Sequence, residues 1–253
     1  MVGLSYGKLG ACENQRAIAI MMTVPPSATI NIDAHLKETR AYLGNLHLVS
    51  AVRLARLATI AEKSVDEVEL RACVSGSVFL SIAFVEAAIN EVFCDAADAY
   101  WQRELGKFRL HKKLAAAWRD GSAANGTTLQ KYQTALLLAE KETFDAGSEP
   151  YQSMESAIRL RNHLIHYEPQ IRTLVPEPVK LPKLEQRLRG KFATNTRAGY
   201  DAFPHAYFSA ACADWVIRIS WSFVDDFFRR LGRYASKHPF YRSELFRNAL
   251  ESL

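Results

Sequence analysis

The run Arg161-Asn162-His163-Leu164-Ile165-His166 brings a cation, an amide and an imidazole into one short segment. Near neutral pH, histidine can take the proton from a ribose 2′-hydroxyl or give one to the leaving 5′-oxygen. Arginine can hold the phosphate and neutralise the negative charge that grows in the transition state. Asn162 could orient the imidazole or donate a hydrogen bond to a phosphate oxygen. These residue types predict an RNA-directed site that needs no metal ion.

The spacing between Arg161 and His166 carries little information by itself, because Arg233 and His238 repeat it later in the chain. The second pair lacks an asparagine after the arginine and follows a basic run. A run of this kind is typical of a helix C-terminus, where cations complement the helix dipole. We therefore interpret the second pair as a chance match.

The context of the first pair is more informative. Residues 151–167 predict an amphipathic helix, with Pro150 at its first turn and Pro169 ending it. Arg161 falls in the middle of the apolar stripe of this helix, where an unpaired charge is costly. His166 lies in the final turn and neighbours Asn162 on the flank of the stripe. The stripe itself consists of Met154, Ala157, Ile158, Leu160, Leu164 and Ile165.

A second intruding charge, Glu86, occurs in an earlier predicted helix. On the helical wheel Glu86 falls within an apolar stripe that includes Val85 and Ile89. A carboxylate and a guanidinium that each enter an apolar face are natural partners. We therefore expect Glu86 to pair with Arg161, either to orient it or to compensate its charge.

Helical periodicity dominates the chain, and the sequence predicts an all-α fold. The simplest architecture is an up-and-down bundle of four to five long helices with an irregular basic excursion. Residues 1–32 are expected to form a partly irregular N-terminal extension, and residues 33–253 a single domain with an irregular basic insertion at 171–204. The helices are expected at 33–63 with an Asp33 cap, from a Ser64–Glu67 capping box toward 105, at 129–144, at 151–167 and at 208–235.

The basic insertion holds most of the excess charge of the chain. Residues 180–197 contain six basic residues and one acidic residue, in a chain whose net charge is +5. Such a segment would attract phosphates, although a solvated basic loop would have the same composition. The candidate RNA-binding residues are Lys180, Lys183, Arg187, Arg189 and Lys191.

Composition excludes several other classes of protein. The 49% hydrophobic and 23% charged content is ordinary for a globular domain. The four cysteines are far apart and show no metal-ligand spacing, so we expect reduced thiols, no metal and no cofactor. No apolar run of about 20 residues is evident, so we expect a cytoplasmic protein that does not span a membrane.

The motif resembles that of a known superfamily. Arg161-Asn162 followed by His166 at a helix end resembles the Arg-(polar)-x3-His motif of the HEPN superfamily. Residues 81–91 also resemble the helix that precedes the motif in many bacterial members. The resemblance covers roughly residues 33–167 and the last helix, and only the short motif is diagnostic.

The resemblance implies an α-helical bundle that dimerises with its motif helices face to face. Many members cleave RNA without metal and leave a 2′,3′-cyclic phosphate, whereas others are toxins, defence components or binding modules. Arg161, Asn162 and His166 are the positions that carry over. Members regulated by nucleotidyl transfer have a tyrosine two places after the histidine, where this chain has Glu168.

Three functional hypotheses follow. The first is a metal-independent endoribonuclease, a homodimer in a bacterial toxin or defence context, with a cognate antitoxin or regulator as a further partner. The second is a non-catalytic HEPN-like module that binds RNA, a nucleotide or a protein. The third is a purely structural helical protein with a buried arginine. An aromatic run in the last helix could stack bases, but its helical spacing favours a core or a dimer seam: Trp215, Trp221, Phe223, Phe227 and Phe228.

Overall fold

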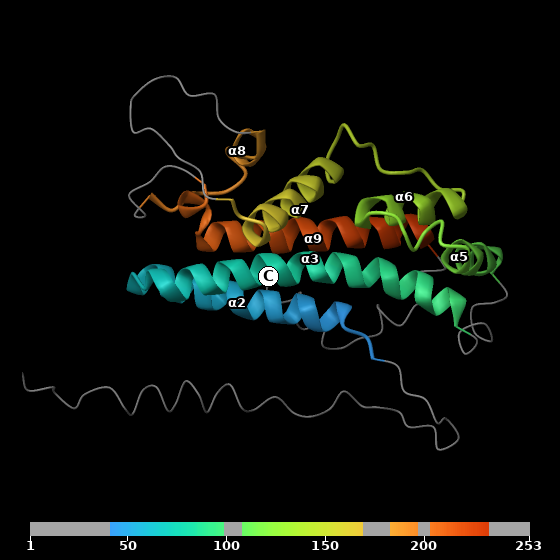
Figure 1. The fold of residues 1–253 in the computed structure, drawn as a ribbon, viewed down its shortest axis with the longest axis horizontal. Helices are drawn as coiled ribbons and strands as arrows, with labels where there is room; N and C mark the ends of the chain where they lie inside the picture. The colour runs from blue at the N-terminus through green and yellow to red at the C-terminus, as the bar shows by residue number, and fades with distance from the viewer. Residues whose placement is uncertain (1–40, 99–107, 169–182, 197–202, 233–253) are drawn as a thin grey trace, which may run out of the picture. The chain divides into compact units, whose positions relative to one another are not determined.

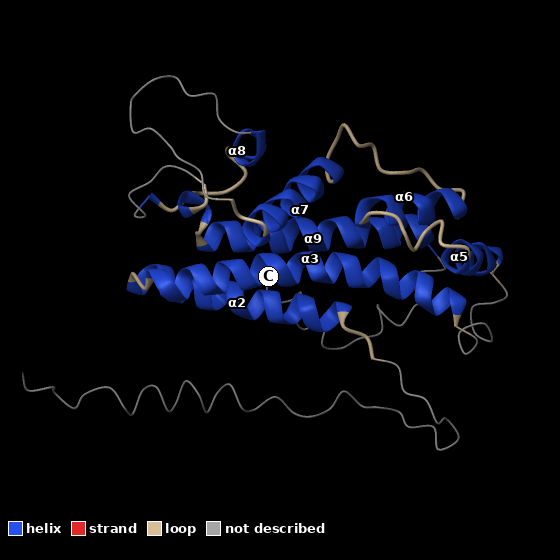
Figure 2. Cartoon of the chain, viewed as in Figure 1, coloured by secondary structure: helices blue, strands red, loops and turns tan. Residues whose placement is uncertain are grey.

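The computed structural model describes residues 41–98, 108–168, 183–196 and 203–232, and all regular secondary structure in these ranges is helical. Three long helices, α2 (Gly44–Ser64), α3 (Glu67–Ala97) and α9 (Ala210–Leu231), lie alongside one another (Figures 1 and 2). The expected all-α helical bundle is confirmed, with shorter helices in place of some of the long ones. These are α5 (Arg109–Arg119), α6 (Thr128–Leu138), α7 (Tyr151–Ile165) and α8 (Lys183–Leu188).

Helix α3 forms the centre of the bundle and contacts α2, α5, α6, α7 and α9. Its apolar residues face all directions, as is usual for a helix surrounded by others, and Phe84 and Phe93 are fully buried. By length and composition α3 could also cross a membrane, so the expectation that no segment is apolar enough was wrong. Its burial among five helices is that of a core helix.

The turn between α2 and α3 differs from the predicted capping box. The hydroxyl of Ser64 donates to Ala61 O at 3.2 Å and so closes α2 instead of opening α3. Val65 then takes a left-handed conformation with φ 61°, and Asp66 caps α3 by accepting from the backbone N–H of Glu69 at 3.0 Å. The carboxylate of Asp66 lies at the N-terminus of the helix dipole, which favours it over a serine.

Both helices are also shorter than expected at their other ends, the start of α2 and the end of α3. Helix α2 begins at Gly44, where the N–H groups of Leu43 and Gly44 donate to Glu91 Oε1 on α3 at 3.1 and 2.9 Å. This carboxylate replaces a local cap, and the predicted cap Asp33 lies outside the described residues. Helix α3 ends at Ala97 rather than near 105, because Asp98 has an extended backbone.

Helix α6 begins with a capping box and ends earlier than predicted. The Thr127 hydroxyl accepts from the N–H of Gln130, while the Gln130 side chain accepts from the N–H of Thr127. The helix stops at Leu138, and the Gln133 side chain binds both the N–H and the carbonyl of Phe144 at 2.9 and 2.7 Å. This clamp returns the chain alongside α6 and replaces the helical turns predicted up to 144.

Helix α7 packs against α3 and α9 through a face that includes the buried residues Met154, Ala157 and Leu160. Within the basic insertion, which was predicted to be irregular throughout, α8 packs against α7. Leu184 and Leu188, four residues apart, share one face of α8 and are buried, which explains why this short stretch is helical.

Candidate functional site

Arg161 forms the predicted ion pair with Glu86. Its Nη2 donates to Glu86 Oε1 across the interface between α7 and α3, so the expected pairing is confirmed. The side chains are 22% and 39% exposed, respectively. The pair therefore lies at the rim of this interface, and the expectation that both charges enter the apolar core was wrong. A half-exposed pair keeps contact with water, which lowers the desolvation cost of both groups.

Thr128, the first residue of α6, supports the same carboxylate. Its hydroxyl donates to Glu86 Oε1 at 3.3 Å, the oxygen that also accepts from Arg161. Side chains from α3, α6 and α7 thus converge on one carboxylate and fix the direction of the guanidinium. Sequence reasoning missed Thr128, because it placed this residue at the end of a loop and no local pattern links it to Glu86.

His166 and Asn162 are open to solvent at the end of α7. The helix ends at Ile165, and His166 is its C-cap, with its N–H donating to Asn162 O at 2.9 Å. Both side chains are exposed, whereas Arg161 is directed toward α3. All three predicted motif residues therefore lie on the last turns of α7. The guanidinium of Arg161 is held by an ion pair, whereas the side chains of Asn162 and His166 are accessible to solvent.

The predicted RNA-binding residues separate into two groups. Arg187 donates to Glu155, and Lys191 Nζ binds Glu149 Oε1 at 2.7 Å, so both cations are paired with carboxylates at the start of α7. Lys183 and Arg189 are exposed and form no ion pair with the described part of the chain. Lys180 lies outside the described residues.

The pKa values of these two carboxyls reflect the contacts. The hydrogen bond from Arg159 lowers the pKa of Glu155, and Arg187 lowers it further against the effect of burial. Burial alone would raise the pKa of Glu149, but the combined hydrogen bonds from Lys191 and Ser153 outweigh it and lower the pKa. The lowered pKa values favour the charged form of both carboxylates. The two carboxylates lie at the contact between α7 and the segment that contains α8.

Sequence reasoning also missed an aromatic contact beside the motif. The ring of Phe203, which precedes α9, lies 6.2 Å from the ring of His163 and 6.1 Å from that of Tyr167. Nδ1 of His163 is 2.8 Å from Arg159 O, and since a carbonyl can only accept, this nitrogen carries the proton. The open end of α7 is therefore bordered by aromatic rings on the side of His163.

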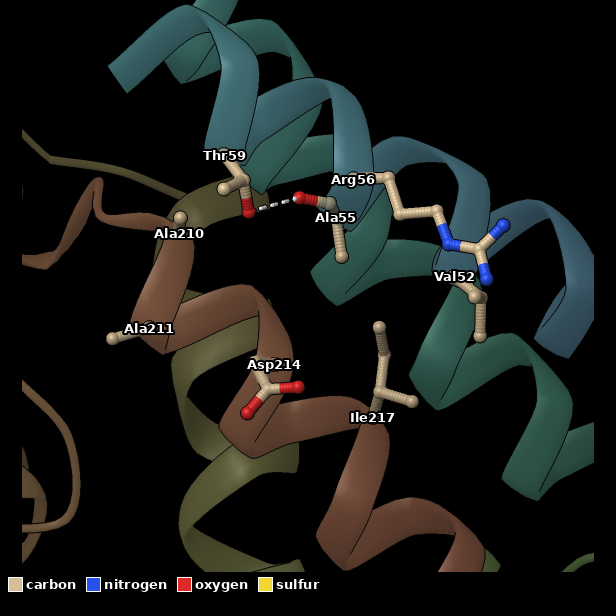
Figure 3. Close-up of a pocket in the computed structure, with 8 residues that line it drawn as sticks. All are labelled: Val52, Ala55, Arg56, Thr59, Ala210, Ala211, Asp214 and Ile217. Carbon is tan, nitrogen blue, oxygen red and sulfur yellow. Dashed lines mark hydrogen bonds between the residues drawn. The ribbon is translucent and has the colours of Figure 1, made fainter. Parts of the chain in front are cut away.

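A separate groove of about 280 Å³ lies between α2 and α9 (Figure 3). Two of its polar side chains are already engaged within their own helices: the Thr59 hydroxyl donates to Ala55 O at 3.1 Å, and Asp214 binds Arg218 at 2.7 Å. None of the predicted site residues line it, so it is not the site that the sequence indicated. The lining residues are Val52, Ala55, Arg56, Thr59, Ala210, Ala211, Asp214 and Ile217.

The cysteines offer no alternative site in the described ranges. Cys73, Cys94 and Cys212 are free thiols, and Cys12 lies outside those ranges. Burial raises the pKa of Cys73 to about 11, which keeps it a protonated, unreactive thiol. No group of three or more histidine, cysteine, aspartate or glutamate side chains in this part of the chain is arranged to hold a metal ion.

Comparisons of the chain with protein-family models, with curated proteins and with solved structures each find no match. The site is therefore interpreted from its own residues and geometry.

Proposed function

We propose that this protein is a metal-independent endoribonuclease of HEPN type whose site is the C-terminal end of α7. His166 acts as the general base or the general acid, Arg161 stabilises the charge on the phosphate, and Asn162 positions the phosphate or the imidazole. In the reaction the 2′-hydroxyl loses its proton and its oxygen attacks phosphorus. The 5′-oxygen then leaves with a proton, which gives a 2′,3′-cyclic phosphate and a 5′-hydroxyl.

The observation that carries the proposal is the contrast between a fixed arginine and an open histidine. Glu86 of α3, which also accepts from Thr128 of α6, directs Arg161, whereas His166 is exposed on the C-cap. A preorganised cation and an accessible proton-transfer group at one helix end are the two groups that phosphodiester cleavage requires of side chains alone.

The test is RNA cleavage in EDTA, with structured and unstructured RNA as substrates. The chain supplies a matched control, because His238 has the same spacing from an arginine as His166. We expect fragments from the wild-type protein and from His238→Ala, but none from His166→Ala. Fragments that persist with His166→Ala, or an intact substrate with all three proteins, would contradict the proposal.

One observation favours the second hypothesis, a non-catalytic module that binds RNA, a nucleotide or a protein. Because Glu86 compensates the charge of Arg161, the guanidinium stabilises the negative charge that grows in a transition state less strongly than a free cation would. A binding module predicts affinity that weakens in Arg161→Ala, with no cyclic phosphate from the wild-type protein. Analysis of the products therefore separates the two functions.

The proposal extends to the setting of the protein. We infer a homodimer with a toxin or defence role, controlled by an antitoxin or another regulator, because the HEPN resemblance implies these features. We infer a cytoplasmic location because four widely spaced cysteines are typical of reduced thiols. Expression in bacteria tests the toxin role. Growth arrest that His166→Ala relieves and His238→Ala does not would support it, and normal growth with active wild-type protein would count against it.

A further inference from the structure

Tyr167 is an exposed aromatic residue directly beside the proposed proton-transfer group. It follows His166 immediately, and 45% of the residue is accessible to solvent. Its phenol makes no hydrogen bond to another described residue, and the backbone around it is no longer helical. A large ring in this position adds to the apolar surface that Ile165, 48% exposed, gives to the same helix end.

Phe203 supports this ring from a distant part of the chain. The two rings are 6.1 Å apart with their planes tilted by 42°, and His163 meets Phe203 edge-on from α7. Phe203 itself is only 8% exposed. The result is a shelf, formed by Tyr167, His163 and Phe203, whose base is buried and whose outer ring is open.

The base of this shelf is rigid. Phe203 packs on Tyr207, with ring centres 5.7 Å apart, and Tyr207 in turn meets Phe192 at 5.8 Å. The backbone is also tied across this layer, since the N–H of Asn195 donates to Ala206 O at 2.8 Å. A ring held by such packing loses little conformational freedom when another ring stacks on it.

The basic insertion brings cations to the surface of α7. Lys191 pairs with Glu149 near the start of α7, while Arg187 pairs with Glu155 further along. Lys183, the first residue of α8, is exposed and forms no ion pair with the described residues. An open aromatic face that directly follows the motif residues is suited to a base joined to a phosphate.

We propose that the shelf of Tyr167, His163 and Phe203 stacks one unpaired nucleobase and so selects single-stranded RNA at this site. The identity of the ligand as RNA rests on the proposed function. A base inside a duplex has both faces covered by its neighbours, so it cannot stack on Tyr167 without leaving the helix. Tyr167 is thus a specificity-determining residue, and its ring, not its hydroxyl, provides the contact.

The experiment measures binding separately from cleavage. The full chain with His166→Ala, in EDTA, is titrated into a short fluorescein-labelled oligouridylate and, in parallel, into a duplex of equal length. Tyr167→Ala, Tyr167→Phe and Ile165→Ala are then added to this background. Ile165 is the matched control, because it is a neighbouring apolar residue that is 48% exposed. Thermal melting checks that each variant is folded.

We expect Tyr167→Ala to weaken binding of the single strand by about tenfold or more, the size of one base–aromatic stack. Affinity for the duplex stays the same, and Tyr167→Phe and Ile165→Ala bind as their parent does. The slope of log affinity against log salt is also unchanged, since no charge is removed. A merely structural role of Tyr167 would not affect the two substrates differently.

Two results would overturn the inference. One is equal affinity of Tyr167→Ala and its parent for the single strand. The other is a change in oligomeric state, seen by light scattering, in both Tyr167→Ala and Ile165→Ala, which would assign the patch to a protein interface. If the wild-type protein does not cleave but Tyr167→Ala still binds the single strand more weakly, the proposed catalysis fails and the stacking site stands.

Discussion

The first turns of α7 and its last turns both carry charged and polar side chains, but their surroundings in the bundle differ. At the beginning, Glu149 and Glu155 are paired with Lys191 and Arg187 of the segment that contains α8. At the end, Arg161 is paired with Glu86, while Asn162 and His166 are exposed. One helix therefore has an end that holds the structure together and an end that remains available to a ligand.

This difference favours the C-terminal end of α7 as the place of the proposed chemistry. The paired side chains at the beginning of α7 contribute to docking of the segment that contains α8, and their removal is expected to affect stability. In the proposed function, the exposed side chains at the open end contact the substrate. Variants at matched positions on the two ends therefore test the difference, and their expected effects range from a large loss of catalysis to a small change in stability.

The largest effect is expected for His166→Ala. Loss of a proton-transfer group lowers the rate of RNA cleavage by about 100- to 10,000-fold, with little change in thermal stability. The matched change at the other end, Glu155→Ala, lowers the melting temperature slightly and leaves the rate within a few-fold. Initial rates on one RNA and thermal melts of both variants check this. Equal rate losses in the two variants would remove the distinction between the ends.

Arg161→Ala is expected to lower the turnover number by about 100-fold, as does loss of a group that stabilises transition-state charge. Arg159→Ala is the matched control, because Arg159 also pairs with a carboxylate, Glu155, at 2.9 Å. Both half-exposed pairs are worth about 1 kcal/mol or less to stability. Steady-state kinetics with both variants separate the roles. An Arg161→Met protein that is fully active and equally stable would favour the purely structural hypothesis.

A smaller effect is expected from the basic insertion. The double variant Lys183→Ala/Arg189→Ala lacks the two exposed cations. Its affinity for RNA should depend less steeply on salt: the slope of log affinity against log salt should fall in magnitude by about one for each phosphate that is no longer neutralised. Removing the paired cations in Arg187→Ala/Lys191→Ala lowers the melting temperature and leaves that slope unchanged. Anisotropy titrations at several salt concentrations make this comparison. The reverse pattern would show that Glu149 and Glu155 release their partners to RNA.

The smallest effect is expected on how the stability of the protein depends on pH. The folded pKa values of Glu149 and Glu155 lie below the ordinary value of 4.5, so their contribution is present above that pH and is lost as pH falls through the lower folded values. At neutral pH, Glu149→Gln/Glu155→Gln should therefore be slightly less stable than the wild-type protein, by about 1 kcal/mol for each exposed pair at most. The difference should shrink as pH falls below 4.5 and vanish once pH is below the lower folded pKa values. Melting curves across this range check it, and a constant difference would speak against the pairs.

Helical periodicity was sufficient to predict the helix that carries the site. The sequence predicted α7 to within two residues at its C-terminus and the pairing of Glu86 with Arg161. The pairing could be predicted because Glu86 and Arg161 each lie among apolar residues on their own helix. A charged residue in such a position needs a partner of opposite charge, even when the sequence does not show which residue it is. The same reasoning overestimated burial, because a helical wheel does not show how far a neighbouring helix extends over a face.

The remaining features depend on contacts between residues distant in sequence. Thr128 binds Glu86 across 42 positions, and Phe203 meets Tyr167 only after the basic insertion has folded back. The basic insertion was interpreted from its local charge alone, so the carboxylates that compensate Arg187 and Lys191 were not considered. Helix α5 was missed entirely, although its sequence is strongly amphipathic.

The central claim is that the open end of α7 cleaves RNA by its own side chains. Mass spectrometry of the 3′ ends produced in EDTA tests it most directly, because a 2′,3′-cyclic phosphate is lighter than a linear phosphate by one water. We predict cyclic ends with the wild-type protein and with His238→Ala, and none with His166→Ala. Linear 3′ ends from the wild-type protein at the earliest times, or cyclic ends in equal amount from His166→Ala, would contradict the claim.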